Sequence, residues 1–223
     1  MTQQEALQEL INRNIITKFD DLKQENPHCD NKLQEYVRKY NETEPNSAEI
    51  FEIITLIVDT DPSLIVRENS NRHSALFDCI LHNKVPVIDL FLAKNPNLVF
   101  YQDSRNETMM HYFARRGAYD KYTHQIAKKN PAALKTYNIF GFAPVHVAID
   151  NSNQTFLDGL YAYRSGSLLL KTQTDPQKTC SELALLKKHD PKMSQWFHII
   201  KPNVIAKIKE RKEKLTAKAE KTK

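Results

Sequence analysis

The chain has 223 residues, of which 40% are hydrophobic and 26% charged, so it is long enough to bury a sizeable core. Its four glycines are far apart, which excludes the glycine-rich loops that bind nucleotide phosphates. The formal net charge is +5, and residues 201–223, with nine basic and three acidic side chains, account for +6. The other 200 residues carry 23 basic and 24 acidic groups, a charge of −1. We therefore expect the basicity to belong to the C-terminal tail.

The first residues and the cysteines indicate the compartment. The start, MTQQEALQEL, lacks the basic and apolar segments of a signal peptide, and no apolar run approaches the ~20 residues that span a bilayer. Cys29, Cys79 and Cys180 are an odd number and form no CxxC pair, which argues against a disulfide framework or a zinc site. We expect a soluble, cytoplasmic protein without a metal or other cofactor.

Residues 1–27 are the first predicted element, a pair of amphipathic helices that caps the N-terminal end. Thr2 and Glu5 have the spacing of a capping box, and the second helix is expected just before Pro27. Residues 31–58 predict another helix pair, whose members are separated by the polar loop NETEPNS.

Helix breakers then recur along the chain at a nearly constant spacing. Prolines at 27, 62, 96 and 131 are separated by 35, 34 and 35 residues, and Gly166 and Pro202 continue the series. An apolar stretch with helical spacing precedes each breaker. Because proline cannot continue the helical hydrogen-bond ladder and restricts the residue before it, each stretch predicts a helix that ends there.

A second motif recurs in the other half of each unit. Four segments begin 34, 35 and 36 residues apart: SALFDCILHN (74–83), TMMHYFARRG (108–117), APVHVAIDNS (143–152) and TCSELALLKK (179–188). They resemble the TPLHxAAxxG signature that opens the first helix of an ankyrin repeat. The matching Thr, Pro and His positions are Thr108, His111, Pro144 and His146, and the small position holds Ala114, Ala148 and Ala184. In the first segment, Ala75 and Phe77 replace the family's Pro and His.

The resemblance implies an all-α fold, an ankyrin-type solenoid of about five to six helix pairs with short turns. A single helix pair is too small to bury its own apolar face, so stability would come from stacking on neighbouring pairs. We expect residues 1–27 to form a helical cap, 28–202 a repeat array and 203–223 a basic tail that is either helical or disordered. The clearest repeats are 69–102, 103–137 and 138–172, and 175–200 would be a degenerate last repeat.

Candidate catalytic residues receive structural interpretations. His111 and His146 stand one repeat apart at the same position, whereas an acid–base pair has to converge on one site. The resemblance implies that these histidines bond between turns and neighbouring repeats. Cys79 has no catalytic signature around it and is expected to be a buried thiol. We predict no enzymatic activity.

The resemblance places partner binding on turn tips and on the first, inner helix of each pair. The assigned positions are Asp78, His82, Arg105, Tyr112, Arg115, Arg116, Phe140 and Asp150. Tyr112, Arg115 and Arg116 fall close together on one helix, and Tyr and Arg are enriched in interface hot spots. The alternatives are a solvated helix face for this cluster and packing on the adjacent turn for Phe140.

The leading functional hypothesis is a non-catalytic scaffold that binds a partner protein. The divergent repeats and the high Asn, Lys and Ile content also resemble ankyrin proteins that intracellular bacteria deliver into the host cytosol, where a host protein would be the partner. The alternative is an adaptor that docks on nucleic acid or an anionic membrane through the Lys-rich tail, 203–223. The other interpretations of that tail are a solvated helix or frayed end, and a helix that packs on a partner.

Overall fold

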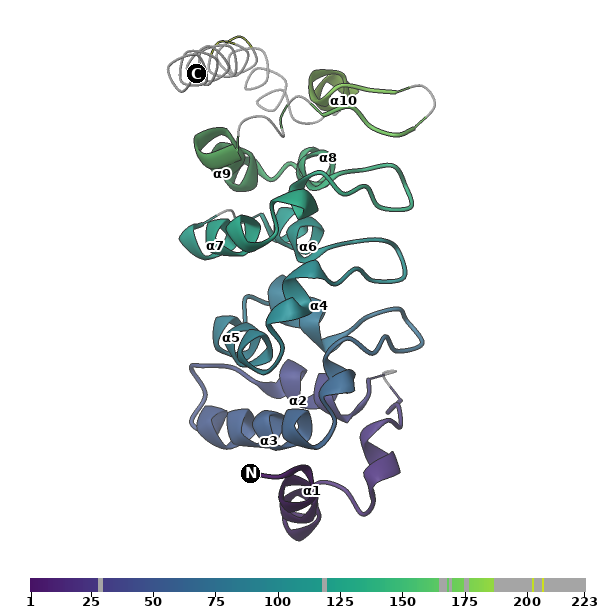
Figure 1. Cartoon of the computed structure of the whole chain (residues 1–223), viewed down its shortest axis with the longest axis vertical. Helices are drawn as coiled ribbons and strands as arrows, with labels where there is room; N and C mark the ends of the chain where they lie inside the picture. The colour runs from purple at the N-terminus through teal and green to yellow at the C-terminus, as the bar shows by residue number, and fades with distance from the viewer. Residues whose placement is uncertain are drawn as a thin grey trace, which may run out of the picture. The chain divides into compact units, whose positions relative to one another are not determined.

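The computed structural model describes residues 1–27, 30–117, 120–164, 168, 170–174, 177–186, 202 and 206. Apart from isolated β-bridges, the regular secondary structure in these ranges is helical, which confirms the all-α prediction. The chain divides into two compact units, Met1–Ser104 and Arg105–Lys223, which are described separately below (Figure 1).

The first unit contains five α-helices in its described residues. They are α1 (Gln3–Asn12), α2 (Lys32–Lys39), α3 (Ser47–Thr60), α4 (Ala75–Leu81) and α5 (Val85–Lys94). Helix α3 packs against α1 and α2, and α4 packs against α2 and α5. Six of its apolar residues are buried, so α3 supplies much of the core of this unit: Ile50, Ile53, Ile54, Leu56, Ile57 and Val58.

The predicted capping box begins the first helix. The backbone N–H of Thr2 donates to Oε2 of Glu5 at 2.7 Å, and the N–H of Glu5 donates to Oγ1 of Thr2 at 3.2 Å. These bonds satisfy two amide groups that have no partner inside the helix, which confirms the start predicted from the Thr2–Glu5 spacing.

The predicted second helix of the N-terminal cap is wrong. The stretch before Pro27 holds only a short 3₁₀ turn, η1 (Phe19–Leu22). The Asp21 carboxylate accepts hydrogen bonds from the backbone N–H groups of Thr17, at 2.8 Å, and Lys18, at 3.0 Å. This side chain holds the backbone in a capped turn, because a short acidic residue competes for amides that a helix would use.

Pro62, Pro96 and Pro131 follow the ends of helices as predicted, and they also begin 3₁₀ turns. The turns are η2 (Pro62–Ile65), η3 (Pro96–Phe100) and η4 (Pro131–Leu134). The residue before each proline is Asp or Asn, and its side chain accepts a hydrogen bond from a backbone amide two or three residues later. Proline costs nothing at the first position of such a turn, because the amide it lacks would have no partner there.

The second unit is also built from paired helices in its described residues. They are α6 (Met109–Arg116), α7 (Lys121–Lys129), α8 (Pro144–Asp150), α9 (Gln154–Arg164) and α10 (Cys180–Leu186). Helix α8 packs against α6, α9 and α10, and α6 also contacts α7. In this unit the turn that precedes α8 extends away from α7 and α9, which lie on the other side of α6 and α8 (Figure 1).

In the second unit, α8 packs against α6 and α10, and each of these three helices carries a small buried residue. Ala114 of α6, Ala148 of α8 and Ala184 of α10 are all fully buried. A methyl side chain at these positions lets neighbouring helices approach closely, as the Ala spacing in the sequence predicts.

Some predictions fall on residues outside the described ranges. These include Gly166, the helix expected before Pro202, and all of the tail 203–223 except Ala206. Within the part of the chain that the structure describes, none of the helices has both the length and the apolarity required to cross a membrane.

Candidate functional site

The candidate site in the second unit is the turn of residues 138–142 together with the side chains that hold it in place. The first of these side chains is His111 on helix α6. Its Nδ1 accepts the backbone N–H of Thr108 at 3.1 Å, and its Nε2 lies 3.0 Å from the carbonyl oxygen of Phe142. Because a carbonyl only accepts, the proton is on Nε2 and the imidazole is neutral. One side chain thus ties the start of α6 to the turn that precedes α8.

His146 makes the same pair of bonds on helix α8. Its Nδ1 accepts the backbone N–H of Ala143 at 2.9 Å, and its Nε2 donates to the carbonyl oxygen of Leu170 at 3.2 Å. Burial lowers the pKa of His111 to about 4 and lowers the pKa of His146 as well. Both rings are fully buried and bonded at both nitrogens, an arrangement suited to holding turns in place.

A buried ion pair joins helix α6 to the same turn. Glu107 is fully buried, and its Oε1 accepts from Nη2 of Arg115 at 2.5 Å and from Nδ2 of Asn138 at 2.9 Å. Burial alone would raise the pKa of this carboxyl, but the bonds from Arg115 and Asn138 outweigh it and the pKa is lowered. Glu107 therefore stays ionised and anchors the turn to the helix.

Residues 138–142 form the turn tip, which Asn138 organises. Its Oδ1 accepts the backbone N–H groups of Phe140 and Phe142, each at 3.0 Å. Gly141 has φ +73°, a left-handed conformation that glycine adopts without steric cost. Ile139 and Phe140 project from this turn and are 54% and 60% exposed. The tip thus presents two large apolar side chains on a hydrogen-bonded support.

Neighbouring segments brace the tip on two sides. The N–H of Ile139 donates to the carbonyl oxygen of Arg105 at 2.9 Å, and the N–H of Gln173 donates to that of Gly141 at 2.8 Å. At the base of the tip, the hydroxyl of Tyr137 donates to the carbonyl oxygen of Lys171 at 2.9 Å. Arg105 and Phe140, two of the predicted binding residues, therefore lie on adjacent turns.

Two of the predicted binding residues are buried, so the prediction that they lie on the surface is wrong. Asp78 is 3% exposed, because its carboxylate faces Arg38 at 3.7 Å and Nδ1 of His73 at 3.4 Å. Tyr112 is 6% exposed, and the guanidinium of Arg115 covers its ring at 5.0 Å. Both side chains are covered by their neighbours and contribute little to the surface of the chain.

The arginines of the predicted hot spot also have structural contacts. Arg115 binds the buried Glu107, as described above. Arg116 lies over the ring of Phe113 at 5.1 Å and 3.7 Å from Asp120, with only 10% of its side chain exposed. The Tyr112–Arg115–Arg116 cluster is thus packed together, which leaves a smaller binding surface than the sequence predicted.

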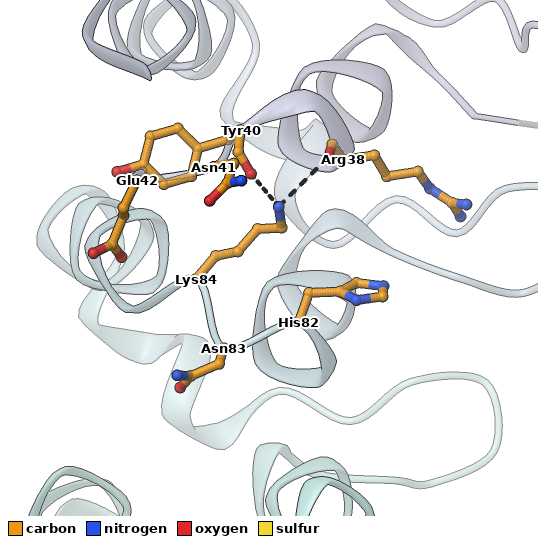
Figure 2. Close-up of a pocket in the computed structure, with 7 residues that line it drawn as sticks. All are labelled: Arg38, Tyr40, Asn41, Glu42, His82, Asn83 and Lys84. Atoms are coloured by element: carbon orange, nitrogen blue, oxygen red, sulfur yellow. Dashed lines mark hydrogen bonds between the residues drawn. The ribbon is translucent and has the colours of Figure 1, made fainter. Parts of the chain in front are cut away.

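The first unit has a polar depression of about 650 Å³ at the C-terminal ends of α2 and α4 (Figure 2). It is lined by Arg38, Tyr40, Asn41, Glu42, His82, Asn83 and Lys84. His82, a predicted binding residue, is exposed at its edge. The ammonium of Lys84 points across the depression to the carbonyl oxygens of Arg38, at 3.4 Å, and Tyr40.

Lys84 therefore caps the C-terminal end of α2, and burial lowers its pKa. Asn153 has an equivalent role in the second unit, where its Nδ2 donates to the carbonyl oxygens of Ala114 at 2.5 Å and Arg115 at 2.8 Å. Neither of these two capping residues was predicted from the sequence. Positions 84 and 153 are 69 residues apart, which is two repeat periods, so their spacing was the available signal.

The remaining predicted residue, Asp150, is exposed at the last position of α8. Within the described residues, no three His, Cys, Asp or Glu side chains gather in a way that could hold a metal ion. Cys79 and Cys180 are buried free thiols, and burial raises the pKa of Cys180 to about 12 and that of Cys79 well above its ordinary value.

No protein-family model matches the chain, and no curated protein matches it.

Proposed function

We propose that the chain is a protein-interaction module built from ankyrin-type repeats, and that the turn tip 138–142 of the second unit contacts the partner. The observation that carries this proposal is the exposure of Ile139 and Phe140 on a turn that is held by the hydrogen bonds of Asn138. An apolar side chain on a rigid support loses little conformational entropy when it binds, so it is a favourable anchor for an interface.

The repeat assignment is supported by bonds that recur at the period of the sequence. His111 and His146, 35 residues apart, use Nδ1 for the start of their own helix and Nε2 for a later carbonyl. Asn69 and Asn138, 69 residues apart, each accept two backbone amides of the turn that follows. Units that repeat the same side-chain roles at 34–36 residues are the signature of a repeat protein.

Affinity capture on the immobilised full chain, followed by calorimetry with the captured protein, tests this proposal. We expect Ile139→Ser/Phe140→Ser to weaken binding by roughly tenfold or more, because the apolar anchor is lost. The matched control is Phe100→Ser, which removes a comparably exposed phenylalanine, 57% exposed, from the first unit and should leave affinity unchanged. Failure to retain any specific protein, or equal binding by the double variant, would contradict the proposal.

The second candidate function is docking on nucleic acid or an anionic membrane through residues 203–223, for which the local charge is the supporting observation. Substitution of Lys207, Lys209, Lys212 and Lys214 with Gln tests it. Under this hypothesis, binding to anionic vesicles or to single-stranded DNA, and its salt dependence, should fall sharply in the variant. Under the leading proposal, capture of the protein partner should persist.

A further inference from the structure

Acidic residues outnumber basic ones in the first unit, and most lysines of that unit pair with a carboxylate. Residues 1–104 contain ten basic and seventeen acidic residues, a charge of −7, whereas residues 105–223 contain 22 and ten, a charge of +12. Since 201–223 contribute only +6 of this, the expectation that basicity belongs to the tail alone is incomplete. Four of the six lysines in the first unit form an ion pair with Asp or Glu: Lys23, Lys32, Lys39 and Lys94.

Lys84 differs from these four, because the partners of its side chain are backbone carbonyl oxygens. Its Nζ donates to the carbonyl oxygen of Arg38, at 3.4 Å, and to that of Tyr40, both at the C-terminal end of α2 (Figure 2). In the part of the chain that the structure describes, no carboxylate forms an ion pair with this lysine. The charge of Lys84 is thus stabilised only by the dipoles of a helix end.

The backbone around Lys84 fixes the point from which this side chain starts. Its N–H donates to the carbonyl oxygen of Cys79 at 2.9 Å, and its own carbonyl oxygen accepts from the N–H groups of Val87 and Ile88, each at 3.1 Å. Lys84 therefore joins the end of α4 to the start of α5, and its side chain extends across the depression of about 650 Å³ (Figure 2). The amine is held at both ends of the side chain and borders space that a small molecule can enter.

These surroundings favour the neutral, nucleophilic form of the amine. Burial lowers the pKa of Lys84, and no paired carboxylate opposes this effect. A neutral amine still has two N–H groups for the carbonyl oxygens of Arg38 and Tyr40, so its lone pair is directed away from them. The other ionisable groups near it are the following: Arg38, Tyr40, Glu42 and His82 of the depression, and the buried Cys79.

We propose that Lys84 is a site of acylation, at which an acyl thioester transfers its acyl group to the amine. The nitrogen lone pair attacks the carbonyl carbon of the thioester, so a C–N bond forms and the C–S bond breaks. The nitrogen gives up one proton and the leaving thiolate takes up one, which yields an amide and a thiol without oxidation or reduction. An amide persists in this water-filled depression, whereas the Schiff base formed with an aldehyde would hydrolyse. The site lies in the first unit and is independent of the turn tip 138–142.

Acylation of Lys84 changes the end of α2. It removes a positive charge from the carbonyl end of the helix, where a cation is favourable. It also leaves one N–H on a nitrogen that bonded two carbonyl oxygens, so one of these groups loses its partner. Because α2 packs against α3 and α4, the modification would loosen the last turn of a helix that contributes to the core of the first unit.

Incubation of the full chain with acetyl-CoA, followed by mass spectrometry of its peptides, tests the proposal. At pH 7.5 we expect Lys84 to be acetylated about threefold or more faster than Lys128, which is exposed, and than Lys94, which pairs with Asp59. All three lysines are compared in one sample, so reagent concentration cancels. The ratio of Lys84 to Lys128 should fall as the pH is raised to 10, because an ordinary lysine then becomes neutral as well.

The same labelling in concentrated urea is the control for the role of the fold. Unfolding removes the depression and the carbonyl partners, so Lys84 and Lys128 should then react at equal rates. Equal rates in the folded chain would overturn the proposal. A preference for Lys84 that persists in urea would also overturn it, since the reactivity would then come from the local sequence.

Two variants test the effect on α2. Lys84→Gln resembles the acylated side chain, whereas Lys84→Arg keeps the charge and the donors. Hydrogen exchange measured by mass spectrometry should be faster over residues 36–40 in Lys84→Gln and near wild type in Lys84→Arg. Equal exchange in the two variants would overturn the effect on α2, and the labelling of the wild-type chain requires neither variant to fold. Capture of a partner through Ile139 and Phe140 tests the proposed function separately, so either proposal can fail without the other.

Discussion

His111 shows how one side chain can hold two segments of this chain together. Its two ring nitrogens serve the first turn of α6 and the carbonyl oxygen of Phe142, which lies 31 residues later. The bond to Thr108 is buried and the bond to Phe142 is partly buried, so water has limited access to either partner when the ring is removed. His111 therefore stabilises the chain mainly because its removal would leave the Thr108 amide and the Phe142 carbonyl without a hydrogen-bond partner.

We expect His111→Ala to lower the free energy of unfolding by roughly 3 kcal/mol, because the Thr108 amide and the Phe142 carbonyl each lose a buried partner. Urea denaturation followed by circular dichroism measures this change. His82→Ala removes an exposed histidine from the first unit and should change the free energy by less than roughly 0.5 kcal/mol. Equal effects of the two substitutions would show that the bonds of His111 contribute nothing.

Stability should also depend on pH through His111. Its pKa is about 4 in the folded chain and 6.5 ordinarily, so between these values the unfolded chain binds a proton that the folded chain does not. The contribution is complete above pH 6.5 and is lost progressively as the pH falls toward 4, up to roughly 3 kcal/mol. Urea titrations at pH 7, 5.5 and 4.5 should show this decline, with a smaller slope in His111→Phe. If stability declines with pH as steeply in His111→Phe as in wild type, His111 is not the cause of the decline.

At the scale of elements, the tip 138–142 is shaped by one glycine and one asparagine. Asn138 draws the amides of Phe140 and Phe142 around its side chain, and Gly141 turns the chain back in a left-handed conformation. A Cβ atom at Gly141 would lie 2.8 Å from the backbone carbon of Gln173. The tip therefore cannot accept a side chain at this position without moving the neighbouring segment.

We expect Gly141→Ala to destabilise the chain by about 2 kcal/mol, because it adds left-handed strain to a clash with the backbone. Thermal and urea unfolding measure the loss. Asn106 provides the control, since it adopts φ +57° in the preceding turn and Asn106→Gly removes strain instead of adding it. A Gly141→Ala variant as stable as wild type would mean that the contact with Gln173 is easily relaxed.

At the scale of the whole molecule, the chain consists of two compact units of opposite charge, −7 and +12. Compact units that bury separate cores can open separately, so a local defect need not reach the other unit. The Glu107–Arg115 pair lies entirely within the second unit, which makes it a suitable place to introduce such a defect.

Arg115→Ala should leave the buried Glu107 carboxylate without its cation and destabilise the second unit by roughly 3 kcal/mol. Hydrogen exchange measured by mass spectrometry should then show faster exchange in α6 and α8, with α3 still protected. The control Lys128→Ala removes an exposed cation and should match wild type. Faster exchange in α3 as well would show that the two units unfold as one.

Much of the secondary structure could be predicted from the sequence because its signals are local. The helices α3, α5 and α7 end just before Pro62, Pro96 and Pro131, since the missing amide and fixed φ of proline act within one turn. The wrong prediction of a helix before Pro27 has an equally local cause. The Asp21 carboxylate accepts hydrogen bonds from backbone amides that the predicted helix would have used.

The candidate site could be predicted only in part. Phe140 is exposed, as expected for a binding residue, whereas Tyr112 and Asp78 are covered by Arg115, Arg38 and His73 from other positions. A family pattern identifies which position of a repeat a residue occupies. It contains no information about which neighbouring side chain folds over that residue.

The sequence by itself determined the period of 34–36 residues, the ends of the helices and the places of His111 and His146, because these depend on backbone chemistry and nearby residues. The tertiary structure decided that Ile139 and Phe140 are exposed, that Arg115 is committed to Glu107, and that the boundary at Ser104 separates acidic from basic halves. The physical reason is that exposure and pairing depend on how side chains pack in three dimensions, even between residues as close in the sequence as Glu107 and Arg115, which are eight apart.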